Sequence, residues 1–208
     1  MATQIYLIRH GETEWSLTGR HTGRTDVPLT ANGERHAAQF REVLQDLKFT
    51  QVLTSPLQRA RRTCELAGFG AMARMEPDLQ EWDYGDYEGR TSVDIRAQQP
   101  GWNLFEDGSP GGESVGQISQ RADRILAVLR SMDGPTLLFS HGHFLRALAV
   151  RWIGLPVLEG RHFALATASL SILGFEHRDD ETPAISLWNA VFTQKKSPTI
   201  DSITGVVP

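Results

Sequence analysis

The residues Ile5-Tyr6-Leu7-Ile8-Arg9-His10-Gly11 decide the fold expected for this chain. Four consecutive apolar residues that give way to charged residues and a glycine are typical of a buried strand ending in a loop. A helix over residues 31–47 should follow, because Thr30 is a suitable N-cap and apolar side chains then recur at helical spacing. The start of the chain therefore predicts a strand–helix unit of an α/β sheet.

The same pattern recurs further along the chain. Residues 51–54 and 136–139 are short apolar runs, each followed by a polar turn, and helical patterns follow at 57–67 and 144–153. Two later segments, residues 170–173 and 185–188, also have strand-like patterns, although they do not share this arrangement of turn and helix. We therefore expect an α/β three-layer sandwich, in which helices flank a mostly parallel mixed central sheet.

Residues 76–113 break this alternation. Tryptophan and tyrosine gather there among glycine, proline and aspartate, which predicts a small lid with short helices. A helix over residues 115–132, capped by Ser114, should follow the lid. We expect one domain over residues 1–208, with 76–113 as a lid insertion and 193–208 as a loose C-terminal tail.

Composition narrows the classes of partner and compartment. The 208 residues suit one domain with a modest lid, and the net charge of −4 comes without a dense lysine and arginine cluster, so no nucleic-acid partner is expected. No apolar stretch approaches the roughly 18 residues of a membrane span, so no membrane partner is expected either. With Cys64 the one cysteine and no signal-peptide pattern, we expect a cytoplasmic protein.

Charged side chains follow the predicted strands where each strand ends. Arg9 and His10 follow the first, Arg59 lies one helical turn after the second, and His141 follows the third. Because ligands bind at the carboxyl ends of parallel strands, these side chains should face one crevice. Two guanidinium groups and two imidazoles suit a tetrahedral dianion such as phosphate, and Gly142 lets the backbone approach it.

Cationic side chains alone would bind a phosphate group without catalysing any reaction of it. A neutral imidazole can act as the nucleophile, and a carboxylic acid is needed to protonate the leaving oxygen. The candidates are Glu81, Asp83, Asp86 and Glu88, whose aromatic neighbours could desolvate a carboxyl group and hold its proton. The residues alone leave the choice between them open.

Four segments, taken in order, resemble the histidine phosphatase superfamily, also called the phosphoglycerate-mutase-like superfamily. They are Arg9-His10-Gly11-Glu12-Thr13, residues 55–63, residues 81–89 and Ser140-His141-Gly142. The resemblance runs from residue 5 to about residue 155. Residues 13–16, residues 81–89 and His141-Gly142-His143 also resemble the branch of sedoheptulose-1,7-bisphosphatase and actinobacterial acid phosphatases.

The resemblance implies catalytic roles. His10 would become a phosphohistidine, while Arg9, Arg59 and His141 would clamp the phosphoryl oxygens. Glu81 would be the general acid, and then the base that activates water.

The resemblance also implies the surroundings of the substrate, with no metal and no cofactor. Ser16, Thr22 and Gly23 would bind the substrate by this resemblance, and the residues themselves add Tyr84, Gly142 and His143 as further substrate-binding candidates. Ser16 stands where many members have asparagine; serine can still donate one hydrogen bond to the phosphoryl group but reaches less far. A homodimer or tetramer would be typical.

We therefore expect a phosphomonoester hydrolase acting on sugar phosphates or other small phosphorylated metabolites. One alternative is a cofactor-dependent phosphoglycerate mutase, which grips its substrate with additional cations. The only cationic residues between Gly89 and Ser114 are Arg90 and Arg96, which are not adjacent in the sequence. His143 stands where the mutases have an asparagine. A non-catalytic module that binds a phosphorylated ligand is a second possibility, and a metallohydrolase built on His141-x-His143 is a third.

Overall fold

One mixed sheet of six strands organises the described chain. The computed structural model describes residues 4–176 and 182–192. Its strands are β1 (Ile5–Arg9), β2 (Gln51–Thr54), β3 (Arg74–Met75), β4 (Thr136–Ser140), β5 (Ser169–Phe175) and β6 (Pro183–Val191), in the spatial order β3-β2-β4-β1-β5-β6. The pairs among β3, β2, β4 and β1 are parallel, whereas β5 pairs antiparallel with both β1 and β6. The predicted tail, residues 193–208, lies outside the described residues.

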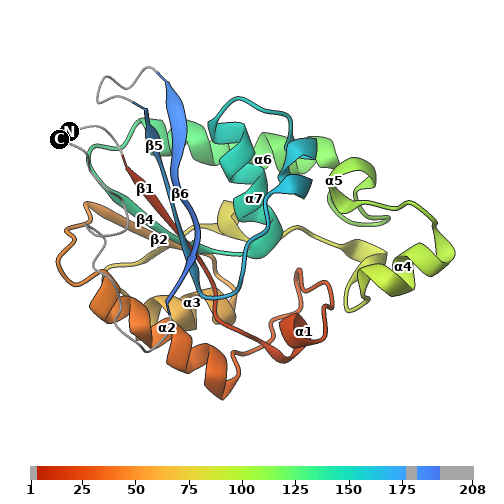
Figure 1. The fold of residues 1–208 in the computed structure, drawn as a ribbon, viewed down its shortest axis with the longest axis horizontal. Coiled ribbons are helices and arrows are strands. Elements are labelled where there is room, and N and C mark those ends of the chain that lie inside the picture. Colours follow the sequence, from red (N-terminus) through yellow and green to blue (C-terminus); the bar gives the residue numbers. More distant parts are fainter. Residues whose placement is uncertain (1–3, 177–181, 193–208) are drawn as a thin grey trace.

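Helices cover both faces of this sheet (Figure 1). The helices α2 (Ala31–Val43) and α3 (Gln58–Leu66) lie on one face, and α6 (Val115–Arg130) and α7 (Gly142–Trp152) lie on the other. Alternation along β1 divides the apolar core accordingly, because Ile5 and Leu7 join the α6–α7 cluster while Tyr6 and Ile8 join the α2–α3 cluster. The predicted three-layer α/β sandwich is confirmed.

Several helix ends differ from the sequence prediction. The caps are as expected: Thr30 and Ser114 accept hydrogen bonds from backbone groups in the first turns of α2 and α6. However, α2 ends at Val43 rather than residue 47, because the chain leaves helical geometry at Leu44, which nevertheless remains in the α2–α3 cluster. Apolar burial therefore continues past the helix, and spacing alone does not show where the helix ends.

Residues 76–113 form a chain of short elements, as predicted. They comprise the 3₁₀ helices η1 (Pro77–Leu79) and η2 (Gly85–Tyr87) and the helices α4 (Ser92–Gln98) and α5 (Leu104–Asp107). Figure 1 shows α4 and α5 extending away from the sheet, on the side where α1 (Glu14–Leu17) also lies. The remaining short element, η3 (Val157–His162), contacts α5 and α7. Whether residues 76–113 act as a lid stays a prediction.

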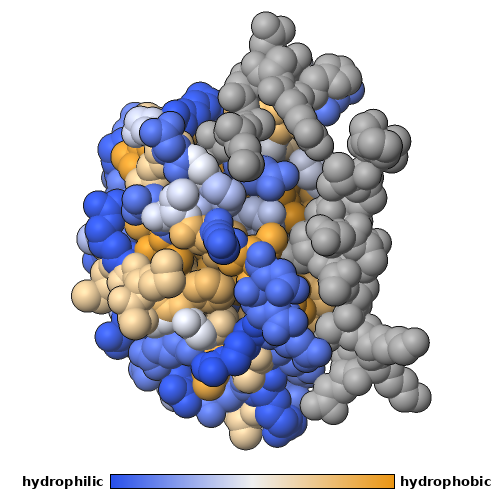
Figure 2. All heavy atoms as spheres, turned by 90° about the vertical axis from the view of Figure 1, so that its left-hand side faces the viewer, coloured by the Kyte–Doolittle hydropathy of each residue, from blue (hydrophilic) through white to orange (hydrophobic). Residues whose placement is uncertain are grey.

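Figure 2 shows the face at the left of Figure 1, where hydrophobic residues form a central area with hydrophilic residues around it. The first three parallel strands all point away from this face, since β1, β2 and β4 share one direction. The polar residues that follow these strands therefore gather at the other end of the sheet.

Two glycines hold the loop after β1 against α2. A Cβ at Gly33 would lie 2.2 Å from the carbonyl oxygen of Glu12, and one at Gly11 would lie 2.5 Å from that of Gly33. Backbone atoms on both sides leave no flexible side chain to move aside. The position of His10, between these backbone contacts and the sheet, thus depends on this close approach.

The variant Gly33→Ala should lower the free energy of unfolding by about 1–3 kcal/mol, because the added methyl overlaps backbone. Gly116→Ala is the matched control, since the nearest atom to its Cβ would be 4.0 Å away and alanine favours the helix by up to ~1 kcal/mol. Urea denaturation measures both. Equal stabilities for the two variants would contradict the importance of the glycine contact.

Candidate active site

The sheet places the two predicted site histidines side by side. In the β1–β4 register Arg9 pairs with Ser140, so His10 and His141 both follow at the same edge. The His10 backbone N–H donates to Ser140 O at 3.0 Å, and the two imidazole ring centres are 5.1 Å apart. The convergence expected from the strand ends is therefore observed.

The His10 imidazole is buried, and one of its two ring nitrogens has a protein partner. Its Nδ1 lies 2.7 Å from the carbonyl oxygen of Gly11, and because a carbonyl only accepts, Nδ1 must carry the proton. Burial, followed by the charges of Arg59 and Arg9, lowers the pKa of His10 well below 6.5, so the ring is neutral at neutral pH. The lone pair of Nε2 is left without a hydrogen-bond partner among the described residues.

Arg9 supplies positive charge beside His10. One of its terminal nitrogens donates to Leu165 O, and the guanidinium packs against Gly142. The Arg9 Nε is buried and has no hydrogen-bond partner in the described part of the chain. An unpaired buried donor of this kind is costly unless a ligand satisfies it.

Arg59 and His141 form a fully buried pair behind His10. The Arg59 Nε donates to His141 Nδ1 at 3.1 Å, while its terminal nitrogens donate to the carbonyl oxygens of Thr22, Gly23 and Thr25. Since arginine only donates, the proton of His141 is on Nε2, which lies 2.7 Å from Ser55 Oγ. Arg59 thus fixes both the tautomer of His141 and the 22–25 loop.

Glu81 joins residues 76–113 to this edge of the sheet. Its Oε1 accepts the N–H groups of Trp82 and Phe144 at 2.9 and 2.8 Å, and its Oε2 accepts that of His143 at 3.0 Å. Two of these donors belong to the first turn of α7, so the carboxylate caps that helix. This explains why α7 begins at Gly142 rather than at residue 144, the predicted start.

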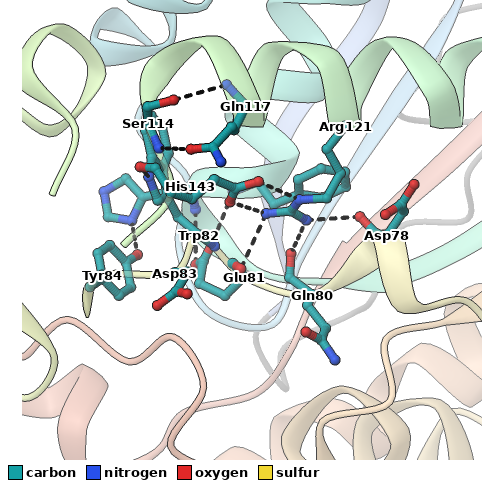
Figure 3. A network of polar contacts seen from close by, with 12 residues as sticks. Asp78, Gln80, Glu81, Trp82, Asp83, Tyr84, Ser114, Gln117, Arg121 and His143 are labelled. Atoms are coloured by element: carbon teal, nitrogen blue, oxygen red, sulfur yellow. Dashed lines mark hydrogen bonds and ion pairs between the residues drawn. The ribbon is translucent and has the colours of Figure 1, made fainter. Parts of the chain in front are cut away.

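Arg121 fixes the backbone on which Glu81 lies (Figure 3). Its fork binds both carboxylate oxygens of Glu113 at 2.8 and 2.6 Å and also donates to the carbonyl oxygens of Asp78, Gln80 and Glu81. Arg121 comes from α6, so one buried guanidinium ties that helix to the segment carrying the candidate acid.

A cavity of about 210 Å³ collects most of the predicted site residues. Predicted residues that line it are Arg9, His10, Ser16, Thr22, Glu81, Tyr84 and His143. Arg59, His141 and Gly142 lie outside this lining, and Gly23 lines a larger depression beyond Glu81 instead. The structure thus separates residues that face the cavity from residues that support it.

The Ser16 hydroxyl faces the cavity but is already committed. It donates to Thr13 O at 2.8 Å and accepts from Thr13 N at 2.9 Å, within the capping box that starts α1. A hydroxyl has only one proton to donate, so Ser16 would have to give up its bond to Thr13 O in order to donate to a phosphoryl oxygen.

His21 is not among the predicted site residues, although the sequence places it beside Thr22. It is buried, lines the cavity and packs 4.7 Å from the Tyr84 ring. The Tyr84 hydroxyl oxygen in turn lies 2.6 Å from His143 Nδ1, and Figure 3 shows this contact. Thr13, Arg20 and Ser92 also line the cavity without having been predicted. Only their proximity to predicted loops could have suggested them.

The structure also bears on metal and membrane binding. In residues 4–176 and 182–192, no three histidine, cysteine, aspartate or glutamate side chains are grouped so that they could share a metal ion. Both nitrogens of His141 have protein partners, so the His141-x-His143 pair is not arranged for metal ligation. No helix in the described ranges is long and apolar enough to cross a membrane.

Comparison with known proteins decides the family. Residues 5–191 match the histidine phosphatase superfamily, branch 1. The chain belongs to this superfamily. An acid phosphatase of Mycobacterium tuberculosis is 46% identical over 178 residues, covering 84% of this chain and 87% of the relative. The solved structure of the M. tuberculosis open reading frame Rv3214 superimposes with a TM-score of 0.85 at 41% identity, covering 91% of this chain and 98% of that one.

Two further relatives are named for different activities. Sedoheptulose 1,7-bisphosphatase of Saccharomyces cerevisiae is 36% identical over 190 residues, covering 76% of this chain and 70% of the yeast protein. A probable phosphoglycerate mutase of Salmonella choleraesuis is 35% identical over 183 residues, covering 83% of this chain and 85% of the relative. The family and branch expected from the sequence are confirmed.

The buried histidines predict how stability depends on pH. Burial lowers the pKa of His10, His141 and His143 well below 6.5, and that of His21 to about 4. Below pH ~6.5 the unfolded chain therefore binds protons that the folded chain does not, and stability falls by about 1.4 kcal/mol per pH unit for each such histidine. Denaturation at pH 7 and pH 5 measures this loss.

His21→Gln should make the loss between pH 7 and pH 5 smaller, because one of these protons is then not taken up on unfolding. An unchanged loss in that variant would show that His21 is not held neutral.

Proposed function

We propose that this protein hydrolyses phosphomonoesters of small metabolites through a phosphohistidine at His10. The observation that carries the proposal is the state of His10: neutral, with the Nδ1 proton donated to Gly11 O and the Nε2 lone pair free beside the cavity. A nucleophile of this kind needs no further activation to attack phosphorus.

In the first step, Nε2 of His10 forms a bond to phosphorus while the bond from phosphorus to the ester oxygen breaks. Arg9 would stabilise the charge on the phosphoryl oxygens, since its buried Nε has no partner in the described chain. His141 would join the clamp by exchanging its bond to Ser55 for a phosphoryl oxygen, with Arg59 holding its other nitrogen.

Glu81 is the proposed proton donor to the leaving oxygen. Its Oε1 accepts two N–H groups and has no lone pair left, whereas Oε2 accepts one and keeps one for proton exchange. In the second step, Oε2 takes a proton from water as the water oxygen attacks phosphorus. The phosphorus–nitrogen bond then breaks, which frees inorganic phosphate and restores His10.

A phosphoglycerate mutase remains the second candidate, favoured by the Salmonella relative. It would use the same phosphohistidine but return the phosphoryl group to a bound product instead of water. Measuring 2-phosphoglycerate against free phosphate, from 3-phosphoglycerate with 2,3-bisphosphoglycerate, separates the two. Faster formation of 2-phosphoglycerate would overturn the hydrolase proposal.

The remaining sequence expectations enter as parts of this proposal. Residues 76–113 would act as a lid, and the enzyme would need neither metal nor cofactor. The buried thiol of Cys64, whose pKa burial raises to about 12, fits a cytoplasmic protein with an unreactive cysteine. A homodimer or tetramer is proposed from the family resemblance alone.

The variant His10→Ala should lower phosphate release from p-nitrophenyl phosphate at least a thousandfold, because no phosphoenzyme can form. His36→Ala, on the half-exposed side of α2, is the control and should keep wild-type activity. Acid-quenched wild-type enzyme should yield an acid-labile phosphoryl adduct that His10→Ala lacks. Activity that survives in His10→Ala, or that EDTA abolishes in the wild type, would contradict the mechanism.

Glu81→Gln should slow phosphoenzyme formation from alkyl phosphates at least a hundredfold, while p-nitrophenyl phosphate should lose less than tenfold in that step. The difference follows because nitrophenolate leaves without a proton and an alkoxide does not. Rapid-quench measurement of the first turnover tests this. Equal losses on both substrates would remove Glu81 from the acid role.

A further inference from the structure

The loop between η3 and β5, residues 163–168, joins the candidate site to the edge of the sheet. It reaches His10 because the antiparallel β1–β5 pairing continues beyond the strands, and the Ala168 N–H donates to His10 O at 3.0 Å. Three residues earlier, the carbonyl oxygen of Leu165 accepts a terminal nitrogen of Arg9. The loop therefore contacts the proposed nucleophile through its backbone and the neighbouring arginine through its side chain.

The orientation of the Arg9 guanidinium depends on this loop. Among the described residues, the Arg9 side chain hydrogen-bonds only to Leu165 O, and its buried Nε has no partner. A movement of the Leu165 carbonyl would therefore turn the guanidinium and displace the Nε that is proposed to bind a phosphoryl oxygen. Displacements of about 1 Å at such a position can cost on the order of a hundredfold in rate.

Two neighbouring residues of β6, the edge strand of the sheet in Figure 1, hold the loop from the other side. The Trp188 Nε1 donates to Ala164 O at 2.7 Å, in an exposed contact. The Asn189 side-chain oxygen accepts the Ala166 N–H at 2.7 Å, in a partly buried contact. These bonds lie on the two sides of Leu165, and the more buried one is made by Asn189.

Asn189 reaches the loop because the backbone of β6 is irregular there. The register between β5 and β6 shifts so that Trp188 and Asn189 are both opposite Ser171, which is a β-bulge. Asn189 has a φ of 59°, a left-handed conformation that asparagine adopts more readily than most residues. Its N–H donates to Ser171 Oγ at 3.0 Å, so the bulge leaves this backbone donor satisfied.

The loop has an unusual conformation of its own. Ala168 has a φ of 49°, and within the described ranges Ala168 and Asn189 are the only non-glycine residues with a positive φ. The Ser169 hydroxyl donates to Ala166 O at 2.6 Å, so both backbone groups of Ala166 are bonded to side chains. Such conformations persist only where surrounding contacts hold them, and they cluster at functional sites. Here the contacts that hold them lead to Arg9.

We propose that Asn189 is a positioning residue for the phosphoryl site and acts through Arg9. Its carboxamide fixes the Ala166 peptide group, which keeps the Leu165 carbonyl where it orients the guanidinium. Asn189 itself is not among the residues that line the cavity containing His10. The inference rests on the proposed function, in which Arg9 stabilises charge on the phosphoryl oxygens, and it adds a residue from a strand that carries none of the predicted site residues.

Two substitutions separate the Asn189 side chain from its backbone conformation. Asn189→Gly keeps access to a positive φ but removes the acceptor, and it should lower kcat/KM for p-nitrophenyl phosphate at least tenfold. Asn189→Asp keeps both the acceptor and the tolerance of positive φ, and it should stay within about threefold of the wild type. No loss in Asn189→Gly, or an equal loss in Asn189→Asp, would overturn the proposal.

A double-mutant cycle tests the route through Arg9. In an Arg9→Gln background, assayed at high enzyme concentration, Asn189→Gly should change kcat/KM by less than about twofold, because the group that Asn189 positions is then missing. Ile185→Ala is the matched control, since Ile185 lies on the same strand but pairs with Leu173, away from the loop. It should lower the Tm and keep wild-type kcat/KM. A full tenfold loss from Asn189→Gly in the Arg9→Gln background would show a general effect on the fold and overturn the proposal.

Binding of inorganic phosphate separates this inference from the proposed function. Calorimetry should show that Asn189→Gly weakens phosphate binding at least fivefold, whereas Asn189→Asp does not. If the wild-type protein hydrolyses no phosphomonoester while this binding difference is seen, the proposed function fails and the positioning role stands. If p-nitrophenyl phosphate is hydrolysed, and Asn189→Gly has wild-type kcat/KM and phosphate affinity, only the positioning role fails.

Discussion

The contact between the Glu81 carboxylate and the N-terminus of α7 holds the rest of the site in place. Through it, a side chain from the 76–113 segment satisfies the N–H groups of His143 and Phe144, which follow directly after β4 and His141. Arg121 then fixes the Glu81 backbone to α6. The candidate acid, the second histidine and the helices behind the sheet are thus coupled by a few buried hydrogen bonds, in which a charged acceptor meets the positive end of a helix.

Electrostatics at this edge of the sheet favours an anion beside His10. Histidines buried near arginines stay neutral, so the local positive charge comes from the guanidinium groups alone. Near His10 the charge comes from Arg59, which is committed to protein acceptors, and from Arg9, whose buried Nε has no hydrogen-bond partner in the described part of the chain.

The shortage of cations between Gly89 and Ser114 is a property of that segment and not of the site. Arg146 and Arg161 reach the same region from α7 and η3, which the sequence of the lid does not reveal. Counting cations in that segment alone therefore underestimates the positive charge near His143. The 22–25 loop shows the same limit, since Gly23 packs against Trp82 O instead of lining the cavity that contains His10.

The sequence by itself determined the sheet and the edge at which the candidate site lies. Apolar runs that end in charged residues and glycine place Arg9, His10 and His141 after parallel strands, and cap residues such as Thr30 and Ser114 mark where helices begin. Each of these features depends on neighbouring residues in the sequence, so a single stretch of the chain is enough to predict it. The two-residue strand β3, the end of α2, the burial of His21 and the commitment of Ser16 and Arg59 were decided only by tertiary structure. They depend on contacts with backbone donors, carbonyl oxygens and charges from segments far away in the sequence, and the local sequence does not predict those contacts.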